Sequence, residues 1–198
     1  MLFFTADEHY GHRKIREYSN RPFGSVEEMD RELIARHNTV VSSGDVVFHL
    51  GDFSFEKTES KTEAKYISEL NGTHLFLRGD HDGWLPHTRG SRDIQTIQVN
   101  RRTGEFYPQR SKRGKCIVMS HYPITRWPLS HYGSWHVCGH VHNGIPSFLQ
   151  YKDMLIPMGK IYNVGVDANN FFPVSLHQLR LIMLGLPRNP NQLKRRVR

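Results

Sequence analysis

The sequence predicts an α/β fold in which two mixed β-sheets pack face to face and are flanked by helices. In the first half of the chain, an apolar run, a loop with an acid or a histidine, and a helical pattern follow one another three times, which is typical of a largely parallel sheet. In the second half, short apolar runs alternate with turns, and little helix is expected. This pattern indicates a second, more antiparallel sheet.

The first half is expected to contain three buried strands and two helices. The run LFFTA at 2–6 is typical of a short buried strand. Ser25 and Glu28 form a capping box for a helix over 25–41, in which apolar residues recur at helical spacing. The remaining expected elements are a strand and loop over 45–53, a helix over 61–70, a turn at 71–73, and a third strand and loop over 74–82.

The second half is expected to contain strands over 94–99, 115–123, 134–142 and 160–167. The segment 100–115 carries many Arg and Lys residues beside Phe106 and Tyr107, and we interpret it as an exposed hairpin or loop. The last stretch, 187–198, is polar, basic and broken by prolines, which predicts a flexible tail. Residues 1–186 are then expected to form a single domain.

Composition excludes a membrane protein and favours an anionic partner. No window of the chain approaches the roughly 18 apolar residues that a bilayer-spanning helix needs, so we expect a soluble, cytoplasmic protein. The net charge of +8 would attract nucleic acid through the basic segment 100–115 and the basic tail.

Cys116 and Cys138 both lie in apolar runs and are interpreted as reduced core thiols. The sequence does not determine an oligomeric state.

Acids and histidines gather directly after the apolar runs. Alone, an aspartate in such a place is typical of a turn, and a single histidine is most often an ordinary polar residue. Five groups at the same end of successive strands are hard to produce by chance. They are Asp7 and His9, Asp52, the run Asp80, His81 and Asp82, His121, and the pair His140 and His142.

Mixed carboxylate and imidazole groups point to a site for two divalent metal ions. Mn²⁺, Fe²⁺ and Zn²⁺ accept such mixed shells. A pair of them can clamp a phosphate while activating a water molecule. The glycines immediately before Asp52, Asp80 and His140 are expected where the backbone turns sharply or approaches the ions closely.

These motifs resemble the signature of the calcineurin-like metallophosphoesterases, which is D-x-H, G-D, G-N-H-[DE], H and G-H-x-H in that order. Here they stand as DEH, GD, GDHD, SH and GHVH within residues 2–142. The stretch with RPF and EMD is similar to small stand-alone members from phages and bacteria. The resemblance implies the metallophosphoesterase sandwich fold, hydrolysis of phosphate esters, and two divalent ions. Mn²⁺ is the expected metal, with Fe, Zn, Ni or Mg as alternatives.

The resemblance also implies a role for each motif residue. Asp52 would bridge the two ions, a hydroxide activated by both would attack phosphorus, and His81 would protonate the leaving oxygen. The first ion would be held by Asp7, His9, Asp52 and His142, and the second by Asp52, Asp80, His121 and His140. His12, Arg13, Arg21 and Arg126 lie in or next to the motif loops and are candidate substrate contacts, with a solvated rim or salt bridges as the alternative.

One departure from the family pattern bears on the substrate. Protein phosphatases of the family carry GDxVDRG after the bridging aspartate, whereas this chain has GDFSFEK, with Phe55 in place of the second aspartate. Phosphoprotein phosphatase activity is therefore disfavoured. Together with the positive charge, this favours phosphodiesters of nucleotide or nucleic-acid type. A phosphomonoesterase acting on nucleotides is the alternative.

The second departure is Asp80, where the family usually has asparagine. An ionised carboxylate has no hydrogen to donate to a substrate phosphate, and it adds negative charge to the site. The residue is compatible with a natural variant tuned to another metal or to a diester, with an engineered or weakened enzyme, or with a degenerate site. In the last case the chain would be a metal-bound, phosphate-binding protein without turnover.

Overall fold

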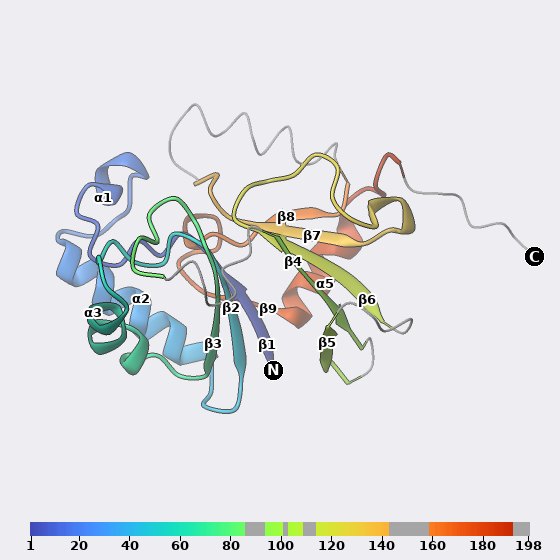
Figure 1. Cartoon of the computed structure of the whole chain (residues 1–198). Helices are drawn as coiled ribbons and strands as arrows, with labels where there is room; N and C mark the ends of the chain where they lie inside the picture. Colours follow the sequence, from blue (N-terminus) through green and yellow to red (C-terminus); the bar gives the residue numbers. More distant parts are fainter. Residues whose placement is uncertain (86–93, 101–102, 109–113, 143–158, 192–198) are drawn as a thin grey trace, which may run out of the picture.

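The computed structural model describes residues 1–85, 94–100, 103–108, 114–142 and 159–191 (Figure 1). The elements, in chain order, are β1 (Leu2–Thr5), α1 (Ile15–Tyr18), α2 (Val26–Val40), β2 (Val46–Leu50), α3 (Glu59–Lys65), η1 (Ile67–Glu69), β3 (Thr73–Leu77), β4 (Ile94–Val99), β5 (Phe106–Pro108), β6 (Lys115–Ser120), η2 (Ser130–Tyr132), β7 (Trp135–Cys138), β8 (Ile161–Asn163), η4 (Val166–Ala168), β9 (Val174–Ser175) and α5 (Leu176–Gly185).

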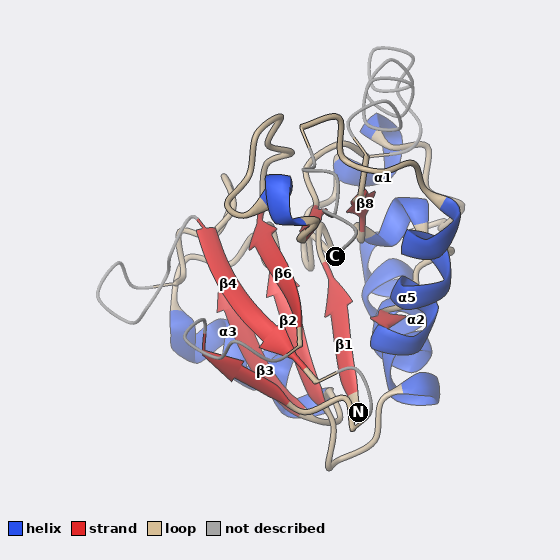
Figure 2. Cartoon of the chain, turned by 90° about the vertical axis from the view of Figure 1, so that its right-hand side faces the viewer, coloured by secondary structure: helices blue, strands red, loops and turns tan. Residues whose placement is uncertain are grey.

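The strands form two mixed sheets, so the predicted fold class is confirmed. The first sheet has the order β3-β2-β1-β9, in which β1, β2 and β3 are parallel and β9 is antiparallel to β1. The second has the order β5-β4-β6-β7-β8. Figure 2 shows β1 running from the N-terminus toward an end of the molecule where loops gather.

The second sheet is less antiparallel than the sequence indicates. Strand β4 pairs antiparallel with β5 and β6, but β7 pairs parallel with both β6 and β8. Parallel neighbours need a crossover connection, which is usually an α-helix and leaves a helical pattern in the sequence. Between β6 and β7 the crossover contains only the short helix η2, so no such pattern marks the parallel pairing.

Helices α2 and α3 lie against the outer face of the first sheet (Figure 1). The predicted capping box of α2 forms in part. The Ser25 hydroxyl accepts a hydrogen bond from the Glu28 amide at 3.1 Å, but the Glu28 carboxylate accepts one from the amide of Gly24 at 2.7 Å. Helix α3 begins and ends earlier than the predicted helix over 61–70, because Thr58 caps its first turn and the chain continues into η1.

Helix α5 was not expected from the sequence. It begins with a complete capping box between Ser175 and Gln178. Its buried residues Leu176, Leu179 and Met183 lie three and four positions apart, which is helical spacing. The sequence therefore contains the signal for this helix, but the signal stands at the end of a half of the chain that otherwise forms strands. The helix packs against β9 and β1 and contributes to the core between the sheets.

The main core lies between the two sheets. Phe4 and Phe48 from the first sheet meet Ile117 and Val137 from the second, and all four are buried. A smaller cluster on the outer face of the second sheet contains Trp127, which stacks on His136 with ring centroids 5.4 Å apart.

Parts of two predicted regions lie outside the described residues. In the basic segment 100–115 these are 101–102 and 109–113, while the described part includes β5, which pairs with β4 as a hairpin would. In the predicted tail, 187–198, the residues outside the described ranges are 192–198. Within the described ranges, no helix combines the length and the apolar character that crossing a membrane requires.

The packing of Phe48 in the core predicts how much this residue contributes to stability. Its ring stacks on Phe4 and forms a T-shaped contact with the ring of Phe106. Phe48→Ala is expected to lower the free energy of unfolding by about 3–5 kcal/mol, because it leaves a cavity between the sheets. Leu75, the register partner of Phe48 on edge strand β3, is exposed and serves as the control. Urea denaturation should give a loss within about 1 kcal/mol for Leu75→Ala. Equal losses for both variants would contradict this packing.

Candidate metal centre

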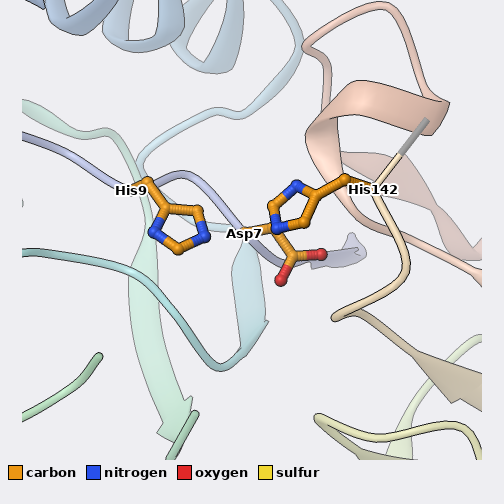
Figure 3. A group of neighbouring side chains, drawn as sticks. All are labelled: Asp7, His9 and His142. Carbon is orange, nitrogen blue, oxygen red and sulfur yellow. The ribbon is translucent and has the colours of Figure 1, made fainter. Parts of the chain in front are cut away.

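The structure brings together all seven predicted metal ligands and His81. Ligand atoms within 4.8 Å of one another occur in four overlapping groups: Asp7 with His9 and His142, His9 with Asp52 and His81, Asp80 with His121 and His140, and Asp7 with Asp52 and His121. The residues come from the loops after β1, β2, β3, β6 and β7. Figure 3 shows Asp7 and His9, which follow β1, beside His142, which follows β7. Buried His and Asp groups of this kind can bind metal ions.

Backbone hydrogen bonds continue the strand pairing into these loops. The amide of Asp7 donates to the carbonyl of Gly51 at 3.0 Å, and the amide of His9 donates to that of Asp52 at 2.9 Å. On the second sheet, the amide of Gly139 donates to the carbonyl of His121 at 2.9 Å. The loops are therefore extensions of rigid strands, which fixes the relative positions of their side chains.

The Asp82 carboxylate ties the loop after β2 to the loop after β3. It accepts hydrogen bonds from the amides of Asp52 at 2.7 Å, Phe53 at 2.9 Å and Gly79 at 2.8 Å, and from the indole of Trp84 at 2.9 Å. Asp82, the last residue of the GDHD motif, is buried and faces these donors. Its role is to hold the backbone on both sides of the site.

Four candidate ligands have a left-handed backbone. The φ angles are 61° for Asp7, 55° for His9, 56° for Asp52 and 70° for His140. Such a conformation costs on the order of 1–3 kcal/mol for a residue with a side chain, and it persists where the surroundings enforce it. Strain gathered in one place is typical of functional sites.

The motif glycines lie where the backbone turns sharply or packs directly against candidate ligands. Gly51 has a φ of +97°, a conformation that side chains disfavour. A Cβ atom on Gly79 would overlap the Asp52 carboxylate, and one on Gly139 would lie 2.8 Å from Oδ2 of Asp7. Glycine is required at both places because the candidate ligands occupy the space.

Two orphaned ring nitrogens test whether the residues fit a metal pair. Nε2 of His9 and Nε2 of His121 are buried without a hydrogen-bond partner, which is costly unless another ligand satisfies them. Both lie near Oδ2 of Asp52, at 3.4 Å and 3.5 Å. Two ligands of one ion with bonds of about 2.1 Å lie about 3.0–3.5 Å apart. The arrangement therefore fits two ions that share Asp52.

Two of the imidazoles are oriented by a hydrogen-bond partner on their Nδ1 atom. Nδ1 of His121 lies 2.9 Å from the carbonyl oxygen of Leu50, and Nδ1 of His142 lies 2.6 Å from Oδ2 of Asp167. A partner on one ring nitrogen directs the other nitrogen toward a metal. Asp167 was not predicted as a site residue, although it follows β8 as the other acids follow their strands and ends the expected strand 160–167.

Arg21 forms a salt bridge with Asp167, which is the alternative to a substrate contact that the sequence left open for this residue. Its side chain is 0% exposed and donates to both carboxylate oxygens of Asp167 at 2.8 Å. It also donates to the carbonyls of Asp7 at 2.6 Å and Glu8 at 2.8 Å. The guanidinium therefore holds the loop after β1 and Asp167, the partner of His142. It has no free side at which a phosphate could bind.

The other three predicted substrate contacts lie at or near the surface. His12 is half-buried; its ring stacks on Phe55 at 4.2 Å, and its Nδ1 lies 3.4 Å from Nδ1 of His9. Arg13 and Arg126 are exposed. Contact of these residues with a substrate stays a prediction.

Glu8, between Asp7 and His9, belongs to a separate buried network that the sequence did not indicate. Its Oε1 lies 2.8 Å from Nδ1 of His49, and Nε2 of His49 lies 3.0 Å from Nδ1 of His74. Burial raises the pKa of Glu8 to about 7. The network anchors the middle of the DEH motif on the helix-covered face of the first sheet.

Charges within the site shift the titration of its members. Burial works against the charged form of His121, but Asp52 and Asp7 outweigh it and raise the pKa of His121 to about 9. Burial of Asp52 is likewise outweighed by His121 and His9, so the pKa of Asp52 lies below its ordinary value. The two carboxylates therefore favour the charged form of His121.

An archaeal protein is similar in sequence to most of this chain. The uncharacterized protein MJ1445 of Methanocaldococcus jannaschii is 31% identical over 175 residues, which cover 88% of this chain and 86% of that protein. The chain belongs to the MJ1445 family. The Gene 66 protein of Mycobacterium phage L5 is 28% identical over 160 residues, covering 71% of this chain and 77% of the phage protein. No family model matches the chain.

A solved structure supports the fold of this member of the MJ1445 family. It is the crystal structure of the protein of unknown function AQ665 from Aquifex aeolicus, with a TM-score of 0.60 and 19% sequence identity. The match covers 92% of this chain and 98% of the Aquifex chain. At this identity the likeness extends to the fold alone.

The raised pKa of His121 predicts pH-dependent metal binding. A divalent ion must displace the proton that His121 holds below pH about 9, so affinity for Mn²⁺ should rise from pH 6.5 toward 9. Calorimetric titrations in buffers of different ionisation enthalpy should detect proton release during binding near pH 7. Binding that is independent of pH and releases no proton would contradict this electrostatic account.

Proposed function

We propose that the protein is a dinuclear, metal-dependent phosphoesterase of the calcineurin-like metallophosphoesterase type, and that it hydrolyses phosphodiesters. The observation that carries the proposal is the pair of orphaned nitrogens, on His9 and His121, on either side of Oδ2 of Asp52. Two ions, with Mn²⁺ the expected metal, would neutralise the phosphate oxygens and activate a water as nucleophile.

His81 is the proposed general acid. Its backbone amide donates to Oδ1 of Asp52 at 2.8 Å, and its ring lies 5.3 Å from the ring of His9. The side chain is exposed, so it borders the site from the solvent side. As the ester P–O bond breaks and water adds to phosphorus, the leaving oxygen would take a proton from the His81 ring.

The surroundings of His81 favour a diester over a monoester. Phe55 is 49% exposed, and its ring centroid lies 5.6 Å from that of His81. An organic substituent could lie against this face, whereas Arg21 is committed elsewhere. The three carboxylates Asp7, Asp52 and Asp80 would leave two dications with one net positive charge, which suits a diester monoanion. The net charge of +8 further favours nucleotide or nucleic-acid substrates.

The general acid is tested with two aryl diesters in the presence of Mn²⁺. His81→Ala should lower kcat on a phenyl diester on the order of 10² to 10⁴ fold. The loss should be much smaller on a 4-nitrophenyl diester, because nitrophenolate leaves without protonation. His177, exposed on α5, is the control, and His177→Ala should leave both rates unchanged. Equal losses by His81→Ala on both diesters would contradict its role.

A substrate panel distinguishes the diesterase from its alternatives. Mononucleotides, cyclic nucleotides and short single-stranded DNA or RNA would be supplied with Mn²⁺, Ni²⁺, Zn²⁺ or Mg²⁺. We expect cleavage of diesters, with Asp80→Asn shifting activity toward the dianionic monoesters because it removes one negative charge. Cleavage of monoesters alone would establish the phosphomonoesterase instead. Bound metal without turnover would establish a phosphate-binding protein.

A further inference from the structure

The Asp80 carboxylate has a partner that the sequence did not indicate. The Tyr122 hydroxyl donates a hydrogen bond to Oδ1 of Asp80. The other oxygen, Oδ2, faces His140 and lies 3.7 Å from its Nδ1. The two oxygens of Asp80 are therefore not equivalent, because one is held by Tyr122 and the other faces a candidate ligand.

The ring of Tyr122 also contacts both histidines of the second metal position. Its centroid lies 4.8 Å from that of His140 and 5.0 Å from that of His121. The Tyr122 carbonyl accepts a hydrogen bond from the Ser120 hydroxyl at 2.6 Å, which fixes the backbone at this point. Tyr122 thus contacts all three side chains that would hold the second ion together with Asp52.

A partner for Asp80 is needed because its side chain is 48% exposed. An exposed carboxylate can rotate, or bind an ion through both oxygens. A hydrogen bond from a neutral hydroxyl to Oδ1 restrains the rotation and leaves Oδ2 as the single oxygen directed at the ion. An asparagine presents one oxygen in the same way. The departure at position 80 is therefore compensated by a neighbouring side chain.

We propose that Tyr122 is a positioning residue that holds Asp80 as a one-oxygen ligand of the second ion. This inference rests on the proposed dinuclear site, and it concerns how the chain retains that site with a carboxylate in place of an amide. Tyr122 acts through Asp80, and its own hydroxyl proton is committed to that residue.

The test measures Mn²⁺ binding rather than hydrolysis. Calorimetric titration of Tyr122→Phe should show the second ion bound about 10–100 fold more weakly, as is typical when the partner of a ligand is lost, and the first bound as in the parent. The variant keeps the ring, so packing against the histidines is preserved. Tyr132→Phe, which removes an exposed hydroxyl on η2, should bind both ions as the parent does.

A second variant shows whether Tyr122 acts through Asp80. In an Asp80→Asn background, both partners of the hydrogen bond between residues 80 and 122 are neutral, so the bond is roughly half as strong. Tyr122→Phe should then weaken binding of the second ion by only about the square root of the factor by which it weakens that binding in the parent protein. An unchanged factor in that background, or parental binding by Tyr122→Phe, would overturn the inference and leave the proposed function intact. A parent protein that binds fewer than two ions would remove both.

Discussion

The candidate site depends on one carboxylate held between two imidazoles. Oδ2 of Asp52 lies 3.4 Å from Nε2 of His9 and 3.5 Å from Nε2 of His121, which come from different sheets. Bringing these atoms together requires the two sheets to present the carboxyl ends of β1, β2 and β6 at the same edge. The left-handed backbone at Asp52 and His9 is the local cost of directing both side chains inward.

Buried polar contacts support this arrangement from behind. Asp82 fixes the amides around Asp52, while Arg21 and Asp167 fix the backbone of Asp7 and the ring of His142. Each supporting carboxylate is buried and hydrogen-bonded, as such groups must be to offset the loss of water. Rigid support of this kind lets a site bind ions without reorganising, whereas Phe55 and Tyr122 on the solvent side of the site are exposed.

Sequence patterns predicted the sheets and the candidate ligands because both leave local signals. Apolar runs mark the strands, and the acid or histidine after each run marks the loop. The contacts among distant residues leave weaker signals. Arg21 and Asp167 are 146 positions apart, so the sequence offered a salt bridge for Arg21 as the alternative to a substrate contact but did not identify its partner. The parallel pairing of β6 with β7 was missed because no α-helix joins them, and the bond between Tyr122 and Asp80 was missed for the same long-range reason.

Electron paramagnetic resonance of the Mn²⁺-loaded protein tests the central claim most directly, because two ions bridged by one carboxylate couple their spins. With two equivalents of Mn²⁺ per chain, the account predicts an exchange-coupled spectrum that Asp52→Ala abolishes. The six-line spectrum of isolated ions in the parent protein would contradict the shared position of Asp52.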